Sequence, residues 1–390
     1  MKNNNPLSQR ISVLIFTLLI TFALNGHVLA HLATTRIDNP LPVKDQNIQL
    51  ALLLDTSNSM DGLIDQAKSQ LWKIVNELAA AKCNDGTRPI ITIALYEYGN
   101  DGLPSSEGYI RLVSPLTNDL DLISEKLFSL TTNGGNEYSG QVIRTSLNQL
   151  AWSTSATDLK MIFIAGNEPF TQGKVPYQTA CALAKQKGIV VNTIFCGNFE
   201  EGIQTSWKNG ADITGGTYMS IEQNKKTVYI TTPYDENIAT MNDKLNETYV
   251  YYGRQGAYKK EQQSTQDQNA ESYSRSNKVD RAISKSSHAY VNSSWDLVDA
   301  AKENEKLILE TSEEDLPKQM KGMTGEQRKT YVNLKSNERK AIQLEIQSQN
   351  KKRQEYITIH TQHESKDATL DAAMIKAIKG QAKSKNLTWQ

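Results

Sequence analysis

The chain has 390 residues, of which 38% are hydrophobic and 22% are charged. This length allows one full-sized domain with a substantial extension, or two domains. Its 43 Lys and Arg residues balance its 43 Asp and Glu residues, so the chain carries no net charge. The balance argues against nucleic acid or an anionic membrane as the main partner, because either would favour a basic surplus.

The first thirty residues have the pattern of a secretory signal peptide. Lys2 and Arg10 precede an apolar stretch at residues 11–24, and Val28-Leu29-Ala30 offers small residues before a cleavage point. The apolar stretch is short for a bilayer span, which needs about 20 residues, although an uncleaved anchor is the alternative. We therefore expect cleavage after Ala30, a periplasmic or secreted protein with no transmembrane segment, and a linker at 31–45.

Residues 46–230 alternate short apolar runs with amphipathic helical patterns. The first run, 48–54, is almost wholly apolar, which is typical of a strand buried on both faces, and 63–78 has helical spacing. The other predicted elements are strands at 90–96, 109–113, 161–164, 189–195 and 217–221, and helices at 119–130, 139–151, 177–186 and near Trp207. This order predicts a doubly wound α/β domain with a mixed six-stranded sheet, whose ligands bind at the carboxyl ends of its strands.

Residues 231–390 form a different, helical region. After residue 233 the chain contains only Pro317 and five glycines, so few residues would interrupt a helix. Helical spacing predicts helices at 236–252, 279–298, 324–346 and 370–378, while 253–276 is either a linker or a solvated helix. We expect a helical hairpin or loose bundle, with a coiled coil as the alternative.

A candidate cation site follows the first strand. Asp55, Ser57 and Ser59 place one carboxylate and two hydroxyls at alternate positions of a turn. Mg²⁺ takes six oxygen ligands, so three protein oxygens would leave positions for water and for a ligand's carboxylate. The alternative is that Asp55 and Ser57 only cap the helix that follows.

This pattern resembles the von Willebrand factor A (VWA) domain, whose metal-ion-dependent adhesion site (MIDAS) uses Asp-x-Ser-x-Ser after the first strand. Three other segments agree with the resemblance, which covers about residues 46 to 225: the loop at 134–137, the strand and loop at 161–169, and the helix, Gly-Gly turn and strand at 207–218. The resemblance implies a Rossmann-like fold and a metal-dependent protein-binding role in the cell envelope. It also implies Mg²⁺, or Mn²⁺ or Ca²⁺, and a protein partner that presents Asp or Glu.

Two loops depart from the family pattern. Where many members supply a Thr, this chain has Asn136 and Glu137, either of which has a suitable oxygen. Gly166 stands where the family has Asp, a loss expected to weaken metal binding about 10–100-fold unless Asn167 or Glu168 substitutes. The implied ligands are Asp55, Ser57 and Ser59, with Asn136, Glu137 and Glu168 as further candidates.

Three cysteines are too few for a disulfide scaffold. In the implied fold, Cys181 lies in a helix that starts at the metal-site edge, and Cys196 ends the strand after that helix. We expect a bridge between them, with two buried thiols as the alternative. Cys83 would lie at the opposite edge, about 20 Å away for a six-residue strand, and is expected to be unpaired.

Two other functional classes compete with metal-dependent binding. A haloacid-dehalogenase phosphatase also has an Asp after a strand, but it needs a second Asp where this chain has Ser57. No Gly-rich phosphate loop follows a strand, and no His occurs between His31 and His288, so a Ser-His-Asp triad is excluded from the sheet domain. We therefore expect no enzyme. The other alternative is a metal-free scaffold whose helical extension mediates assembly.

Overall fold

A six-stranded sheet lies at the centre of the computed structural model, which describes residues 46–360 and 369–389. The strand order is β4 (Ile110–Thr117), β3 (Ile90–Tyr98), β1 (Asn47–Asp55), β5 (Leu159–Gly166), β6 (Val190–Cys196) and β7 (Tyr218–Ile221). Edge strand β4 pairs antiparallel with β3, and the other pairs are parallel. The predicted mixed sheet is confirmed. The expected signal peptide and the linker at 31–45 lie outside the described residues.

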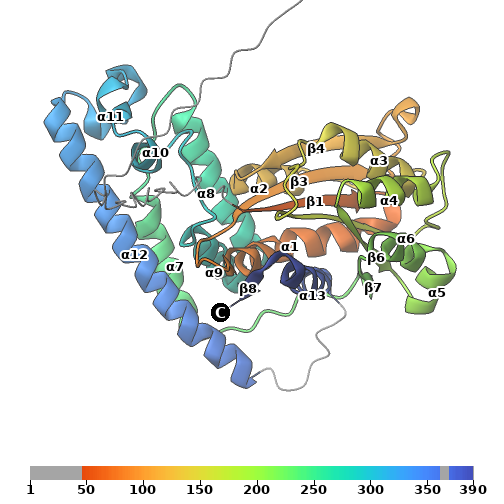
Figure 1. Cartoon of the computed structure of the whole chain (residues 1–390). Coiled ribbons are helices and arrows are strands. Elements are labelled where there is room, and N and C mark those ends of the chain that lie inside the picture. The colour runs from red at the N-terminus through yellow and green to blue at the C-terminus, as the bar shows by residue number, and fades with distance from the viewer. Residues whose placement is uncertain (1–45, 361–368, 390) are drawn as a thin grey trace, which may run out of the picture. The chain divides into compact units, whose positions relative to one another are not determined.

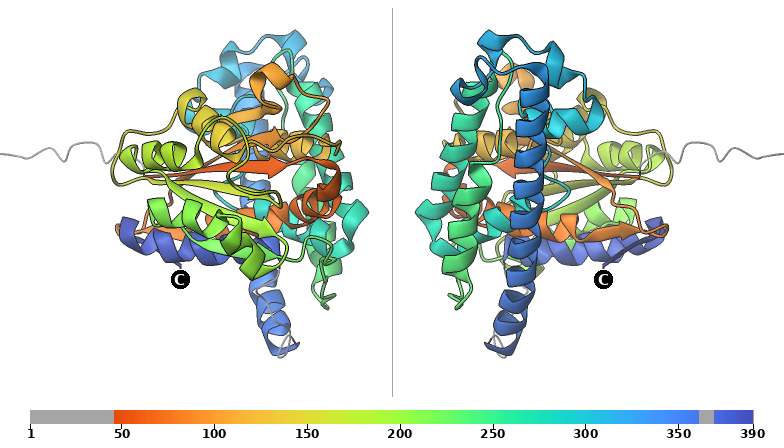
Figure 2. Two further views of the ribbon diagram at one scale, coloured as in Figure 1. Left: turned by 90° about the vertical axis from the view of Figure 1, so that its right-hand side faces the viewer. Right: turned by 90° about the vertical axis from the view of Figure 1, so that its left-hand side faces the viewer.

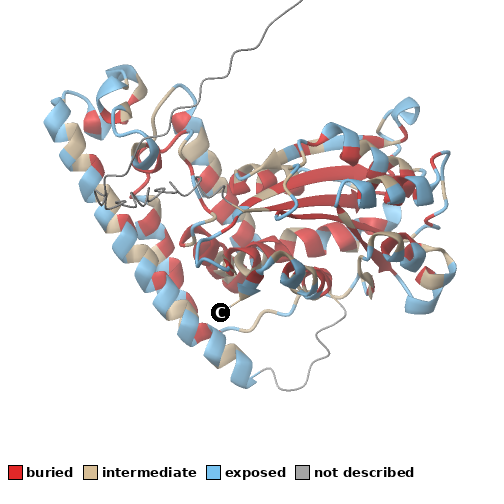
Figure 3. Cartoon of the chain, viewed as in Figure 1, coloured by how far each residue is buried: buried red, intermediate tan, exposed pale blue. Residues whose placement is uncertain are grey.

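Helices cover both faces of the sheet because its central strands are apolar on both sides (Figures 1 and 3). Along β1, Leu50, Leu52 and Leu54 enter one core, while Ala51 and Leu53 enter the other. The first core includes side chains of α1 (Asp61–Ala79) and α2 (Leu120–Phe128). The second includes α3 (Ser139–Gln149), α4 (Tyr177–Gln186) and α6 (Trp207–Thr214), next to the short α5 (Phe199–Gln204). Every residue of β5 is buried, as a parallel strand between two helical layers requires.

The C-terminal segment returns to the sheet domain. Helix α13 (Leu370–Ala382) packs beside α1 on the first face (Figures 1 and 2), and β8 (Leu387–Trp389) pairs antiparallel with β2 (Ala81–Cys83). Residues between β7 and α13 are therefore an insertion into the sheet domain. The expected division at residue 230 is wrong for this last segment, because the apolar side of α13 is buried against the sheet and α1.

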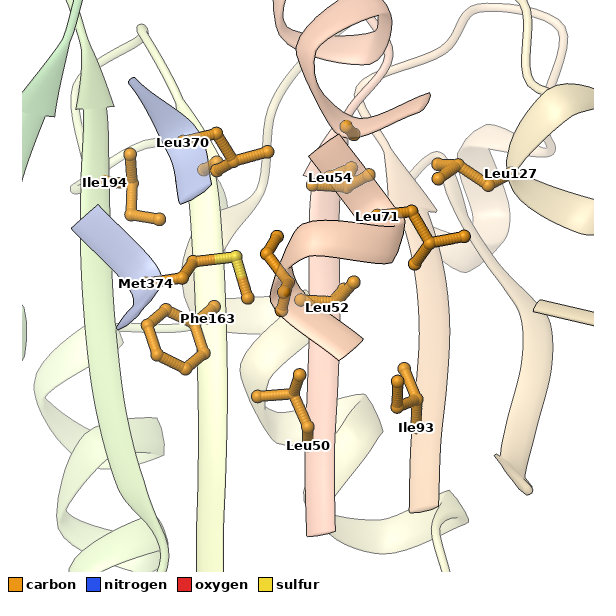
Figure 4. A pocket seen from close by; sticks show the side chains of 13 residues that line it. Leu50, Leu52, Leu54, Leu71, Ile93, Leu127, Phe163, Ile194, Leu370 and Met374 are labelled. Atoms are coloured by element: carbon orange, nitrogen blue, oxygen red, sulfur yellow. The ribbon is translucent and has the colours of Figure 1, made fainter. Parts of the chain in front are cut away.

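A small apolar cavity of about 20 Å³ lies where α13 meets the sheet and α1. Figure 4 shows Leu370 and Met374 of α13 near Ile194 and Phe163 of the sheet, while Leu71 of α1 lies on the other side of the cavity near Leu127. All the side chains that line it are apolar, so a water molecule inside would find no hydrogen-bond partner. The cavity marks an imperfectly filled contact between the returning helix and the domain core.

The insertion is helical throughout most of its length. It contains α7 (Asp235–Asn246), α8 (Gly256–Tyr273), α9 (Arg275–Lys285), α10 (Leu297–Glu303), α11 (Leu307–Glu310) and α12 (Gly325–His360). Residues 253–276, predicted as either linker or helix, contain the whole of α8. A capping box opens α12: Thr324 N donates to Gln327 Oε1 at 2.8 Å, and Gln327 N donates to Thr324 Oγ1 at 3.3 Å. No helix of the described residues is both long and apolar enough to span a bilayer.

Three buried arginines hold the insertion together and attach it to the sheet domain. Each guanidinium binds two aspartates through charge-assisted hydrogen bonds. The groups are Arg281 with Asp121 and Asp267, Arg339 with Asp296 and Asp299, and Arg353 with Asp235 and Asp280. Because Asp121 belongs to α2, the first group joins α9 to the sheet domain directly. The insertion is thus packed onto the sheet domain and is not a separate bundle.

The expected bridge between Cys181 and Cys196 is not formed. Cys181 of α4 lies in the core on one face of the sheet, whereas the side chain of Cys196 points with Ile194 into the core on the other face. The sheet separates the two sulfur atoms, although both residues lie near the same edge. Cys181, Cys196 and Cys83, which ends β2, are all buried free thiols.

Candidate metal centre

The turn after β1 places Asp55, Ser57 and Ser59 together at the carboxyl edge of the sheet. Asp55 is fully buried, and its Oδ1 accepts a hydrogen bond from Ser57 N at 2.8 Å. The hydroxyls of Ser57 and Ser59 are 3.3 Å apart, and Ser59 is exposed. No side-chain hydrogen bond caps the helical turn after Ser57 or α1 itself. Helix capping therefore does not account for the two serines and Asp55.

Glu137 supplies a second buried carboxyl to this centre. Asp55 and Glu137 converge at Gly99, where an added Cβ would lie 2.8 Å from both Asp55 Oδ1 and Glu137 Cγ. Gly99 also has a φ of +82°, so both its conformation and its surroundings favour glycine. Gln172 Oε1 accepts from Glu137 N at 2.6 Å and orients the loop. Asn136 is exposed, so of the two neighbours it is Glu137 that the fold brings to Asp55.

The third loop contributes an amide in place of the missing carboxylate. Asn167 Nδ2 donates to Ser59 Oγ at 3.1 Å, which brings the Asn167 side chain to the centre. An added Cβ at Gly166 would lie 2.5 Å from Tyr98 Oη and 3.1 Å from Asp55 Oδ2, so no side chain fits there. Glu168 is exposed, and its backbone oxygen accepts from Trp207 Nε1 at 2.8 Å.

Burial makes the two carboxyls difficult to ionise together. Burial, and then the neighbouring Glu137, raise the pKa of Asp55 well above its usual value. Burial also raises the pKa of Glu137, against the opposing effect of its contacts with Asp55 and Ser57. Burying two carboxylates side by side is costly unless a positive charge joins them. Electrostatics therefore favour either a shared proton or a bound cation.

Three buried oxygens at this centre lack a hydrogen-bond partner within the described part of the chain. They are Asp55 Oδ2, Glu137 Oε2 and Asn167 Oδ1. Buried polar atoms are almost always paired, so three neighbouring exceptions need an explanation. Together with the two serine hydroxyls they form an all-oxygen set of the kind that Mg²⁺, Mn²⁺ and Ca²⁺ bind. These residues fit a hard divalent cation.

Among the described residues, no three His, Cys, Asp or Glu side chains are grouped to hold a metal ion. A cation at this centre would depend on serine and asparagine oxygens as much as on the two carboxylates. The sequence identified Asp55, Ser57, Ser59 and Glu137 as candidates and named Asn167 only as a substitute. It gave no indication that Tyr98 would occupy the space beside Gly166, because the two are 68 positions apart and meet only across the sheet.

Comparison with protein-family models and with curated proteins gives no match to this chain. Several solved structures are similar to part of this chain. BatB from Bacteroides thetaiotaomicron is 15% identical over 45% of this chain and 90% of its own, with a TM-score of 0.34. The SpRpn10 VWA domain is 16% identical over 45% of this chain and 88% of its own, with a TM-score of 0.34.

A third similar structure is proximal thread matrix protein 1 from the mussel byssus, with a zinc-occupied MIDAS motif. It is 14% identical over 46% of this chain and 43% of its own, with a TM-score of 0.36. Such low identities concern the fold of the sheet domain and not its function. With Asp-x-Ser-x-Ser at the tip of a buried central strand, one antiparallel edge strand and helices on both faces, the sheet domain has the von Willebrand factor A fold.

Proposed function

We propose that this protein is a metal-dependent protein-binding module of the cell envelope. Asp55, Ser57, Ser59 and Glu137 hold Mg²⁺, Mn²⁺ or Ca²⁺, and an Asp or Glu of a protein partner completes the coordination. The observation that carries the proposal is the cluster of three unpaired buried oxygens around two adjacent carboxyls. A bound cation would supply the positive charge that both the carboxyl pair and an incoming carboxylate need.

The buried and the exposed residues of the centre have different roles in the proposed binding. Asp55 and Glu137 are buried and provide negative charge from within the fold, whereas Ser59 is exposed and marks the side open to a partner. Asn167 donates a hydrogen bond to Ser59, and its side-chain oxygen takes the place of the carboxylate that is missing at Gly166. The site therefore has an interior that attracts a cation and an outer side that a partner can reach.

The proposed location outside the cytoplasm rests on the first thirty residues. Their charged start, apolar stretch and small residues before Ala30 match an export signal. Amino-terminal sequencing of the protein from envelope extract tests the location, and a mature chain that begins at His31 is the expected result. An intact Met1 would contradict it.

A metal-free scaffold is the second candidate function. Gly166 and Tyr98 favour it, because the tyrosine fills the position from which the family's third-loop carboxylate would act. The three buried arginine groups also make the helical insertion a firm platform for assembly. In that case the oxygen cluster would bind only a proton, and assembly would not respond to a chelator.

Calorimetry and thermal melting with Mg²⁺, Mn²⁺ and Ca²⁺ separate the two functions. We expect the wild type to release or absorb heat and to melt at a higher temperature, since a ligand at 100 times its Kd stabilises by about 2.7 kcal/mol. Asp55→Asn keeps an acceptor for Ser57 N but should lose the response. The exposed Asp243 serves as the matched control, and Asp243→Asn should respond as the wild type does. A wild type that shows no response would leave only the scaffold.

A further inference from the structure

A polar cleft of about 300 Å³ lies within the insertion, lined by residues of α10 and α12, by Tyr249 and by the segment that follows α9 (Figure 1). One lining residue, His288, donates through Nε2 to Pro89 O at 3.2 Å, and Pro89 directly precedes β3. The other end of β3 lies at the metal centre, on the order of 25 Å away for a nine-residue strand. The cleft is therefore separate from the metal centre and lies at the opposite edge of the sheet.

The buried floor of the cleft is already neutralised. Arg339 and Asp299 line it and are only 2% and 5% exposed. Arg339 makes five hydrogen bonds, to Asp296, to Asp299 and to the hydroxyl and backbone oxygens of Thr248, which use all of its N–H donors. Asp299 also accepts from Lys302 Nζ at 2.9 Å. The floor thus offers no free charge to a ligand.

Two exposed side chains of α10, Lys302 and Glu303, carry the charges that remain available in the lining. Lys302 gives one N–H donor to Asp299 and keeps two. Within residues 46–360 and 369–389, the Glu303 carboxylate has no ion pair and no hydrogen bond. Outside the lining, Lys260 donates to Tyr249 O at 2.7 Å, so the surroundings do not favour a ligand that is only cationic. One ammonium and one carboxylate suit a ligand that carries both charges.

The walls of the cleft add hydrogen-bonding atoms that have no partner in the described part of the chain. His288 donates through Nε2, so its Nδ1 is an acceptor in the neutral ring, and burial lowers the pKa of this imidazole. Gln343 Nε2 donates to a backbone oxygen at 3.2 Å, which leaves Oε1 as a second acceptor. The Tyr249 hydroxyl makes no hydrogen bond to any described residue. Together with Glu303, these atoms provide three acceptors, as many as an ammonium has N–H donors.

We propose that this cleft binds a free α-amino acid, with its ammonium held by Glu303 and its carboxylate held by Lys302. The acceptors of His288 and Gln343 complete the ammonium site. The volume agrees with this class, since about 300 Å³ is at the lower end of the range for small-molecule sites. Val291, which also lines the cleft, adds apolar surface for an aliphatic side chain.

Titration of the full chain with the common α-amino acids, followed by ligand-observed NMR, tests this class. The tightest binder is then compared with its N-acetyl form, which lacks the ammonium, and with its amide, which lacks the carboxylate. Each modified form should bind about 3- to 30-fold more weakly, because it loses one charge-assisted contact at a partly exposed site. If no amino acid binds, or if the three forms bind equally, the inference is wrong.

Two variants assign the two charges of the ligand. Glu303→Gln should weaken the amino acid and its amide about 3- to 30-fold but leave the N-acetyl form unchanged. Lys302→Met should weaken the amino acid and its N-acetyl form but not the amide. Glu305→Gln and Lys306→Met are the matched controls, at exposed positions of the same segment outside the lining, and should bind as the wild type does. Losses that do not depend on the form of the ligand would contradict the assignment.

A third variant fills the cleft. Val291 is 39% exposed, so Val291→Trp should abolish binding while the melting temperature changes little. Val228→Trp, at a 63% exposed position outside the lining, is its control and should bind normally. Equal binding by the two tryptophan variants would place the amino acid elsewhere and overturn the inference.

This inference and the proposed function fail independently. Asp55→Asn and EDTA should leave amino-acid binding unchanged, because the metal centre is at the other edge of the sheet. If either one removes amino-acid binding, the ligand binds at the metal centre and the inference is wrong. If the wild type binds an amino acid but shows no calorimetric response to Mg²⁺, Mn²⁺ or Ca²⁺, the cleft stands and the metal-dependent function fails.

Discussion

The hydroxyl of Tyr98 lies where a side chain of Gly166 would begin. A Cβ added at Gly166 would be 2.5 Å from Tyr98 Oη, well inside van der Waals contact. Tyr98 is fully buried and its hydroxyl donates to Ala165 O at 3.0 Å, so it cannot move away easily. Tyr98 of β3 thus reaches past β1 to β5, and its position there excludes a carboxylate from position 166.

Gly166→Ala should destabilise the protein by about 1–3 kcal/mol, the usual cost of overpacking a filled core. In the Tyr98→Phe background the cost should shrink, because the atom closest to the new methyl group is gone. Urea unfolding of the two single variants and the double variant gives the coupling energy. Gly380→Ala is the matched control: nothing lies within 4 Å of that position in α13, so a small stabilisation is expected. If the losses of unfolding free energy in the two single variants simply add in the double variant, Tyr98 is not the side chain that excludes a methyl group at position 166.

Met374→Ala should loosen α13 from the sheet domain. Met374 is 1% exposed and borders the apolar cavity, so truncation would enlarge an existing void and cost about 2–5 kcal/mol. Lys383→Ala, at an exposed position just after α13, should change the melting temperature little. If the two variants have the same melting temperature, the packing of α13 does not stabilise the domain core.

Arg339→Met should destabilise the insertion by about 3–5 kcal/mol, because it leaves buried Asp296 without its cation and Asp299 with only the exposed Lys302. The guanidinium binds Asp296 and Asp299 and lies 4.0 Å from the centre of the Tyr249 ring. Arg254→Met, at an exposed position, is the control. Unfolding in guanidinium chloride would be monitored by tryptophan fluorescence. If Arg339→Met lowers the free energy of unfolding no more than Arg254→Met does, the buried ion pairs do not stabilise the insertion.

Lys285 should make the protein more stable as pH rises from 7.5 to 9.5. Burial, partly offset by Asp267, lowers the pKa of Lys285 from 10.5 to about 8. Between these two pKa values the unfolded chain holds more protons than the folded chain, so the free energy of unfolding rises with pH. The gain from this group is about 2 kcal/mol over that range.

Lys285→Met removes this titration and provides the comparison. The variant will be less stable at every pH because Asp267 loses a partner, but its stability should rise less between pH 7.5 and 9.5. Urea midpoints at several pH values measure both slopes. Parallel slopes would contradict the assignment of the titration to Lys285.

Much of the sheet domain follows from local sequence patterns. The apolar run at 48–54 lies within β1, the helical spacing at 63–78 lies within α1, and the capping box at Thr324 opens α12. These patterns indicate the secondary structure that each segment adopts on its own or against any apolar surface. The metal ligands Asp55, Ser57 and Ser59 remain a prediction, although their convergence with Glu137 agrees with it.

Other features depended on which segments meet. Helix α8 is polar on most sides, so the spacing of its few apolar residues does not distinguish a helix from a linker. The Cys181–Cys196 bridge was wrongly expected because both residues lie near one edge, whereas strand alternation places their side chains on opposite faces.

The sequence by itself determined the alternation of strands and helices, the Asp-x-Ser-x-Ser turn at the end of a buried strand and the helical character of the second half. Each of these depends on neighbours a few positions apart. Only the tertiary structure decided that α13 closes the sheet domain, that Glu137 reaches Asp55 and that Tyr98 leaves no room at Gly166. Those contacts join residues from tens to hundreds of positions apart, and an apolar or acidic side chain does not encode which distant surface will cover it.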